Sequence, residues 1–439
     1  MNQVLYGYSV SGATWLYLSA LLIVGVYFRF SRLWSTRNLD LVLLLALSPG
    51  LLLVRQADVA ADPDRVRTIG YAILLATSLA ILLRVLVDPF AKWRPRFEQN
   101  MNSAGMLWLS VCAVIFLGTR AIAEPIVAQA AAPLVVEAAA GEGTSGPASP
   151  LAAAPMALLI EQLTPPVFAI CAHLAVIVGL LVIGRRLLDD FGSGVAMVAM
   201  YLLLPCTSLT VGEVNHVLPS AFLLWAFVNW RRPLAAGILV ALACGMLVFP
   251  VFLLPLWLSF LGRSGWKRFL MGFAATAAVL FGSFALISTD LQQFVERTTG
   301  AMEWYRLTLQ SPVLDAADAA PVAVAERSGD FWTAANYWEP YRLPVIAAFA
   351  IMLIVMTVWP RPKTLELLLA QQVATIIAVQ FWLPDAAGTY ILWYLPILLT
   401  LMFRTRLTMT FEQAERFAAA RQTTKPASST SIPATSSLR

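Results

Sequence analysis

The 439-residue chain is too apolar and too poor in charge for a soluble protein of its length. Hydrophobic residues make up 59% of it and charged residues only 13%, whereas soluble chains are about one-quarter charged. A membrane-crossing helix needs roughly 20 mainly apolar residues, because lipid offers no partner to unpaired backbone groups. Such stretches recur from Ala13 to Phe403, without the ten-residue alternation of a membrane barrel. The composition therefore predicts an all-α, polytopic transmembrane protein with about 13 spans (11–13).

Short charged clusters separate the apolar stretches. The eighth and ninth share one run, 234–261, which contains Phe249-Pro250. Because proline disfavours helix in the residue before it, we expect a tight reversal there, with one kinked helix as the alternative. The spans are expected near 13–30, 39–54, 68–87, 104–120, 166–184, 192–209, 217–230, 234–248, 250–262, 268–288, 343–359, 365–383 and 388–403.

Charge predicts the orientation of these spans. With the amino end outside, most of the 30 Lys and Arg residues fall on one side and most acidic residues on the other. Lys and Arg favour the cytoplasmic side, so the long loops 121–165 and 288–342 are expected outside. We predict one transmembrane domain, 1–404, followed by a cytoplasmic tail, 405–439, with an amphipathic start and a disordered end.

Few residues in the apolar stretches suggest chemistry. No Gly-rich phosphate loop, His-Glu-x-x-His or Gly-x-Ser-x-Gly pattern occurs, which leaves ATP-driven transport and familiar soluble hydrolase chemistry unsupported. Of the two histidines, His173 lies in an apolar run and favours a hydrogen-bonded structural role. Glu213, Asn215 and His216 supply a carboxylate, an amide and an imidazole. Glu213 and His216 share a face at i, i+3 if the helix begins near Glu213; a capping role for Glu213 or Asn215 is the alternative.

An ordered series of motifs occupies residues 166–288. It comprises Gly212-Glu-Val-Asn215, Trp225-Ala-Phe-Val-Asn-Trp-Arg-Arg-Pro233 and Phe249-Pro250-Val-Phe-Leu-Leu-Pro255-Leu-Trp257. The series resembles GT-C superfamily membrane glycosyltransferases, and specifically their polyprenol-phosphate-mannose-dependent α-mannosyltransferase branch. The resemblance implies a GT-C-like fold in the bacterial cytoplasmic (inner) membrane. It also implies transfer of a mannose-like sugar from a polyprenyl-phosphate donor to an outward-facing lipid or glycan acceptor, with no cofactor and no metal.

The chain departs from the family pattern at two positions. Glu213 stands where the family usually has glutamine, and Leu247 stands where it usually has lysine. A lysine beside a lipid-phosphate donor would place a positive charge on the phosphate. Two other functions therefore stay open: a non-catalytic, GT-C-derived membrane subunit or lipid-binding partner, and a transporter, for which internal repeats would be expected.

The first predicted outer loop, from Arg55 to Arg67, holds three aspartates and three arginines. Glycosyl transfer needs a carboxylate to deprotonate the acceptor hydroxyl and positive charge to stabilise the departing phosphate. A solvated turn has the same composition and is the alternative. We predict that the base is one of Asp58, Asp62 and Asp64. The predicted substrate-binding residues are Arg65 and Arg67 at the phosphate, Glu213, Asn215 and His216 in the pocket, and Asp330, Trp332 and Trp338 in the second long loop. The expected partners are membrane lipids, the sugar donor and the acceptor, and no nucleic acid.

Overall fold

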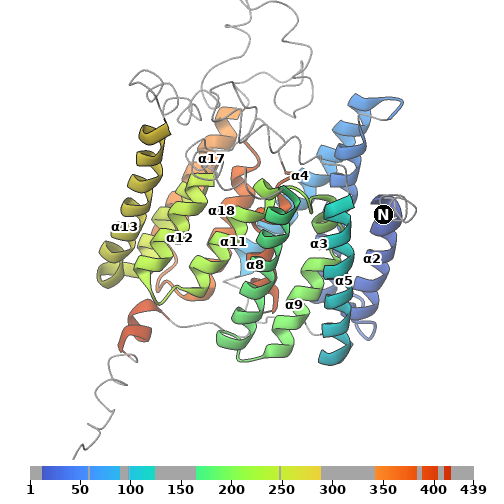
Figure 1. The fold of residues 1–439 in the computed structure, drawn as a ribbon, viewed down its shortest axis with the longest axis horizontal. Coiled ribbons are helices and arrows are strands. Elements are labelled where there is room, and N and C mark those ends of the chain that lie inside the picture. The colour runs from blue at the N-terminus through green and yellow to red at the C-terminus, as the bar shows by residue number, and fades with distance from the viewer. Residues whose placement is uncertain are drawn as a thin grey trace, which may run out of the picture.

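The computed structural model describes residues 12–57, 60–88, 97, 99–123, 165–246, 249–287, 342–382, 388–403 and 410–416. Within these ranges the chain is helical, and strand pairing is confined to one isolated bridge between Thr364 and Thr410. The predicted all-α fold is confirmed. Figure 1 shows the helices side by side in a bundle.

The helical elements occur in an order that gives every expected span a counterpart. Four of those described, α3, α4, α5 and α8, are long and apolar enough to cross a membrane by length and composition. Of the others, α13 is longer, with 34 residues and a kink at Gly262, and the rest are shorter. The number of spans therefore stays a prediction. The elements are α2 (Gly12–Tyr27), α3 (Thr36–Gln56), α4 (Pro63–Val87), α5 (Ser103–Ala123), α8 (Pro165–Arg186), α9 (Phe191–Leu203), α10 (Pro205–Leu209), α11 (Val214–Val228), α12 (Pro233–Met246), the 3-10 turn η3 (Phe249–Leu253), α13 (Leu254–Ile287), α17 (Arg342–Val358), α18 (Leu365–Val379), the 3-10 turn η7 (Ile391–Trp393) and α19 (Leu395–Phe403).

Side-chain caps mark several helix starts. The first N–H groups of a helix have no partner within it, and a preceding Asp or Thr side chain accepts a hydrogen bond from one of them. Asp62 caps α4, Asp190 caps α9 and Thr364 caps α18. These residues therefore decide locally where the helices begin.

Proline and glycine residues interrupt the helices. The span expected over 192–209 is divided, because Leu204 precedes Pro205 and adopts ψ 126°, which ends α9. The reversal expected at Phe249-Pro250 is present as η3 between α12 and α13. Within α13, Gly262 adopts φ 57° and ψ −154°, a conformation that glycine tolerates, and this kink separates the two spans expected on either side.

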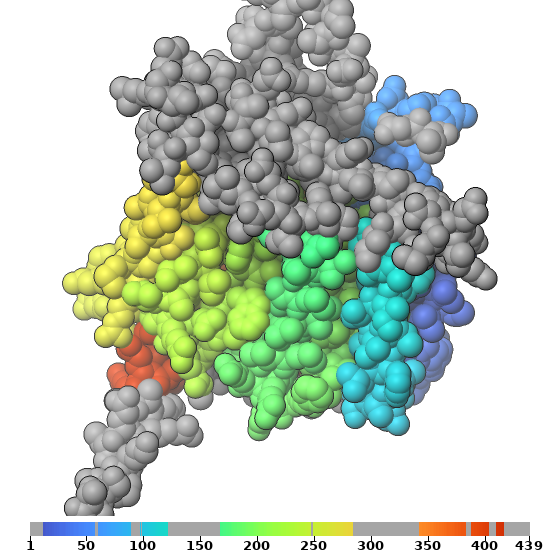
Figure 2. Space-filling view, in the orientation of Figure 1, coloured from blue at the N-terminus to red at the C-terminus, as the bar shows by residue number. Residues whose placement is uncertain are grey.

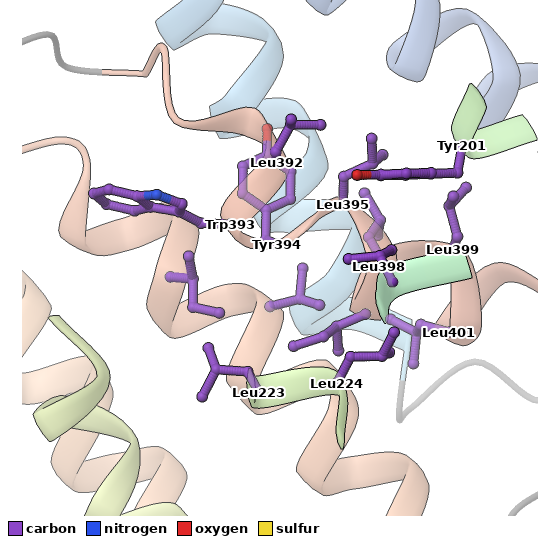
Figure 3. Close-up of a cluster of buried hydrophobic side chains, with 14 of the residues drawn as sticks. Tyr201, Leu223, Leu224, Leu392, Trp393, Tyr394, Leu395, Leu398, Leu399 and Leu401 are labelled. Atoms are coloured by element: carbon purple, nitrogen blue, oxygen red, sulfur yellow. The ribbon is translucent and has the colours of Figure 1, made fainter. Parts of the chain in front are cut away.

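Helix α18 forms the centre of the bundle, since each of its residues is buried. It contacts α4, α13, α17 and α19. Figure 3 shows Leu395, Leu398 and Leu399 of α19 in one cluster with Tyr201 of α9 and the α11 leucines 223 and 224. Just before α19, a hydrogen bond from the indole of Trp393 to the carbonyl oxygen of Asn215 places the chain beside the start of α11.

The outward faces of the peripheral helices are apolar. α2, α5 and α17 each expose large hydrophobic side chains, among them Leu21, Trp108 and Ile354 at 71%, 71% and 64%. In water such extended apolar surface is unfavourable, whereas lipid is as apolar as the side chains themselves. Figure 2 shows α5, α8, α12 and α13 forming one continuous side of the bundle.

Different segments of the chain lie at the two ends of the bundle. Figure 1 shows the turn from α3 to α4, the last residues of α5 and α13, and the first residues of α8 and α17 at one end. The chain therefore leaves the bundle before residues 124–164 and 288–341, and returns to it after each of them, at the same end. The prediction that both long loops lie on one side of the membrane requires this arrangement. Which end faces the cytoplasm stays a prediction.

Residues 410–416 lie at the opposite end, against α13. Phe411 is buried there, with its ring 6.5 Å from that of Trp230 and 6.2 Å from that of Phe260. The amphipathic start of the predicted tail is thus attached to the bundle by the ring of Phe411 and by the bridge between Thr410 and Thr364.

Candidate active site

The end of α3 and the start of α11 bring three charged or ionisable side chains into contact. Arg55, in the last turn of α3, forms an ion pair with Oε1 of Glu213. The other carboxylate oxygen, Oε2, lies 2.9 Å from Nε2 of His216 in the first turn of α11. One carboxylate therefore holds both a guanidinium and an imidazole. We call Arg55, Glu213 and His216 the charged cluster.

The α3–α4 pair holds Arg55 in place by close backbone packing. A Cβ atom at Gly50 would lie 3.0 Å from the carbonyl oxygen of Gly70, and one at Gly70 would lie 3.0 Å from that of Gly50. Only residues without a side chain allow the two helices to approach this closely. The same end of α3 then reaches the loop before α11.

Glu213 is available to Arg55 and His216 because it does not cap the helix that it precedes. It occupies the N-cap position of α11, but its side chain makes no capping hydrogen bond. The helix begins at Val214, so Glu213 and His216 lie on one face at i and i+3. The predicted shared face is confirmed, and the capping alternative is wrong for Glu213.

The electrostatics of the cluster keep the carboxylate ionised. Burial alone would raise the pKa of Glu213, but the charge and hydrogen bond of His216, followed by those of Arg55, outweigh it and lower the pKa to about 2. The side chains of Arg55 and Glu213 are 31% and 27% exposed, and that of His216 is 12% exposed. Arg55 is therefore the member most open to a ligand.

The imidazole of His216 has one engaged and one unengaged nitrogen. Nε2 faces Glu213, whereas Nδ1 is buried and has no hydrogen-bond partner among the described residues. When a neutral imidazole carries its proton on Nε2, toward the carboxylate, Nδ1 offers a lone pair. Buried polar atoms without partners are uncommon, and a substrate hydroxyl would satisfy this one.

His173 has the structural role that was predicted for it. Its Nδ1 lies 2.8 Å from the hydroxyl of Tyr201 and its Nε2 lies 3.2 Å from the carbonyl oxygen of Val211. Both ring nitrogens are thus engaged, and Val211 stands two residues before Glu213. His173 supports the loop that carries the charged cluster.

Four aromatic rings, beginning with that of His216, lie one against the next. The ring centroid of His216 lies 4.7 Å from that of Tyr390, Tyr390 lies 3.9 Å from Trp393, and Trp393 lies 4.4 Å from Phe249. The indole Nε1–H of Trp393 also donates a hydrogen bond to the carbonyl oxygen of Asn215, at 3.0 Å. We call these four rings the ring column. It joins α11, η3 and the segment around η7.

The predicted catalytic aspartates that the structure describes have local partners. Asp62 caps α4 by accepting a hydrogen bond from the backbone N–H of Arg65, at 3.2 Å. Asp64 is 91% exposed and lies 3.6 Å from Arg67. Within the described part of the chain, neither forms a hydrogen bond or ion pair with Glu213. The segment that contains them follows Arg55, a member of the charged cluster, in the chain.

Several predicted site residues lie outside the described residues, and what was predicted of them stays a prediction. They are Asp58, Leu247, Asp330, Trp332 and Trp338. Among the residues that the structure does describe, no group of three or more His, Cys, Asp or Glu side chains is arranged to hold a metal ion.

Comparison with protein families connects this site to a known class of enzyme. The model of glycosyltransferase family 87 matches residues 144–384, more than half of the chain. The chain belongs to glycosyltransferase family 87. The resemblance to GT-C membrane glycosyltransferases is thereby confirmed, and the protein is a membrane glycosyltransferase. No curated protein and no solved structure matches the chain.

The family 87 match includes only part of the site. Glu213, His216 and Phe249 lie within it, whereas Arg55 precedes it and Tyr390 follows it. Sequence reasoning noted Arg55 among the loop arginines without giving it a role, and it missed Tyr390 and Trp393. The only signal for the latter two is their i, i+3 spacing after Thr389, which a membrane-interface aromatic pair would also show.

Proposed function

We propose that this family 87 protein transfers a mannose-like sugar from a polyprenyl-phosphate donor to a lipid or glycan acceptor. The reaction would take place at the charged cluster, on the outer face of the bacterial cytoplasmic membrane. The observation that carries the proposal is the contact of a guanidinium, a carboxylate and an imidazole at one end of the bundle. This end is also where the chain enters and leaves the two segments predicted to be outer loops.

The departing group of this reaction is a lipid phosphate, which needs positive charge as it leaves. Arg55 supports this step because it is partly exposed and its guanidinium is already held in the site by Glu213. A planar guanidinium matches phosphate oxygens in a bidentate way. Arg65 and Arg67, proposed from the sequence, would add charge from the adjoining first turns of α4.

The acceptor hydroxyl must lose a proton, and two groups are proposed to receive it. One is an aspartate of the segment 58–64, of which Asp58 stands three residues after Arg55. The other is His216, whose unpartnered Nδ1 is a suitable acceptor when Nε2–H points to Glu213. General-base assistance contributes roughly 10²–10⁴-fold to rate, so the true base is identifiable by substitution.

Transfer from labelled polyprenyl-phosphate mannose by protein in lipid vesicles tests both the function and the base. We expect the wild-type protein to transfer sugar, Arg55→Gln to bind the donor more weakly, and the variant lacking the true base to lose at least 10²-fold in rate. The variants are Asp58→Asn, Asp62→Asn, Asp64→Asn and His216→Gln. Full activity in the three aspartate variants would remove that segment from the mechanism.

The same assay separates the proposed enzyme from its rivals. Tight binding of the donor without transfer would contradict the proposal and favour a non-catalytic lipid-binding subunit. Accumulation of intact substrate inside the vesicles would instead favour a transporter.

A further inference from the structure

The ring column and the charged cluster share the ring of His216, which lies against the ring of Tyr390. The planes of Tyr390 and Trp393 are 13° apart, and those of Trp393 and Phe249 are 18° apart, so these three rings lie nearly parallel. Tyr390, Trp393 and Phe249 are 8%, 0% and 4% exposed. The column is therefore a buried and well-packed support that ends on the imidazole of His216.

The column is anchored to the same first turn of α11 that it supports. Trp393 Nε1–H donates a hydrogen bond to the carbonyl oxygen of Asn215, the residue before His216. The carbonyl oxygen of Tyr390 accepts a hydrogen bond from the side-chain amide of Gln380, at 3.2 Å. Backbone and ring positions around His216 are thus tied to the end of α18 and to η7.

These contacts restrict the imidazole in two directions. The contact between Nε2 and Glu213 holds one edge of the ring, and Tyr390 covers one face with the planes 33° apart. A half-turn of the ring about its χ2 angle would put Cε1 where Nε2 lies and Cδ2 where Nδ1 lies, so neither nitrogen would keep its position. The ring of Tyr390 lies against one face of the imidazole and resists this rotation.

We infer that Tyr390 is a positioning residue, which fixes the ring of His216 so that Nε2 faces Glu213 and Nδ1 faces the acceptor. The inference rests on the proposed function and extends it to a residue beyond the range of the family match. Tyr390 acts through its ring face, so phenylalanine at this position preserves the effect and leucine removes it.

The test compares Tyr390→Leu with Tyr390→Phe in the full-length protein, using two readouts. The first is the kcat and the donor KM of sugar transfer. The second is the ring ¹⁵N signal of His216, which is assignable because the chain has only two histidines and the signal is absent from His216→Gln. The second readout reports the ring itself and does not require activity.

We expect Tyr390→Phe to keep a single His216 tautomer protonated on Nε2. We expect Tyr390→Leu to show mixed ring signals and a kcat lowered by roughly 10- to 100-fold, with a nearly unchanged donor KM, because misplacement of about 1 Å costs up to that factor. Trp393→Phe keeps a ring in the column but loses the bond to Asn215, so it should shift both readouts less and in the same direction.

Phe269→Leu is the matched control. Phe269 stacks on Trp257 with centroids 5.7 Å apart, and its backbone adjoins Gly237 near the start of α12, whereas the ring column follows the end of that helix. Its loss should reduce thermal stability and leave the His216 signals unchanged.

Wild-type kcat and ring signals in Tyr390→Leu would overturn the inference, as would equal changes in the Phe269→Leu control. An equal loss in Tyr390→Phe would assign the effect to the hydroxyl instead of the ring face and would also overturn it. If the wild-type protein transfers no sugar, the proposed function fails, while the ring signals still decide whether Tyr390 holds His216.

Discussion

Replacing Glu213 by glutamine removes the negative charge of the cluster and leaves the side chain almost the same shape. Arg55 then has no counter-charge from this position, and His216 loses its carboxylate partner. The carboxyl has a pKa of about 2 instead of its ordinary 4.5. At about 1.4 kcal/mol per pKa unit, this difference amounts to roughly 3 kcal/mol of stabilisation at neutral pH. The side chain is 27% exposed, so screening by solvent reduces the expected loss to about 1–2 kcal/mol.

The pH dependence of this loss has a definite sign. The pKa of Glu213 is lower in the folded than in the unfolded protein, so its stabilising effect is fully present above pH 4.5 and is lost as the pH falls through about 2. The stability difference between wild-type and Glu213→Gln protein should therefore be largest near neutrality and shrink on acidification below pH 4.5.

Thermal unfolding in detergent, followed by tryptophan fluorescence at pH 7 and at pH 3, measures this difference. We expect the Tm of Glu213→Gln to be lower by roughly 2–5 °C at pH 7 and closer to that of wild type at pH 3. Glu412→Gln, at an exposed position on the helix at 411–416, is the control and should change Tm little. A double variant with Arg55→Gln should lose less than the sum of the two single losses, because both changes remove the same ion pair. An unchanged Tm at pH 7, or a difference at pH 3 as large as that at pH 7, would refute the reasoning.

Three further substitutions, two of them with a matched control, test the packing of the bundle, each by Tm in detergent. His173→Leu leaves the Tyr201 hydroxyl and the Val211 carbonyl without this partner, and it should cost about 1–3 kcal/mol; no loss would mean that His173 does not support the loop before Glu213. Gly237→Ala places a Cβ atom 2.1 Å from the carbonyl oxygen of Phe269 and should cost about 1–3 kcal/mol. Gly118→Ala brings a Cβ atom within 4 Å of no other part of the described structure beyond its own helix turn and should instead gain up to about 1 kcal/mol of helix propensity; equal effects would contradict the close approach of α12 and α13. Arg84→Gln leaves the carboxylates of Asp40 and Asp88 without a guanidinium that lies 3.0 and 2.7 Å away, and it should cost about 3–5 kcal/mol, whereas exposed Arg65→Gln should change Tm little.

Much of the fold follows from local features of the sequence. Long apolar runs predict membrane helices, Asp62, Asp190 and Thr364 begin helices because their side chains accept from free N–H groups, and Pro250 lies at a reversal because it disfavours helix before it. The family resemblance, too, came from motifs that are short and contiguous. Where the local rule was applied incompletely, as at Pro205, the predicted span was too long.

The candidate site likewise combines contacts within one helix start, which the sequence predicts, with long-range contacts, which it does not. The i, i+3 relation of Glu213 and His216 is a property of one helix start, so the sequence by itself determined it. The ion pair to Arg55 spans 158 residues of chain, and the bond from Trp393 to Asn215 spans 178. Contacts of that kind depend on how closely helices approach, as at Gly50 and Gly70, and on the packing of α19 in the core. Periodicity shows which side of a helix is apolar but not which neighbour covers it. Only the tertiary structure therefore decided that an arginine and a column of aromatic rings complete the site.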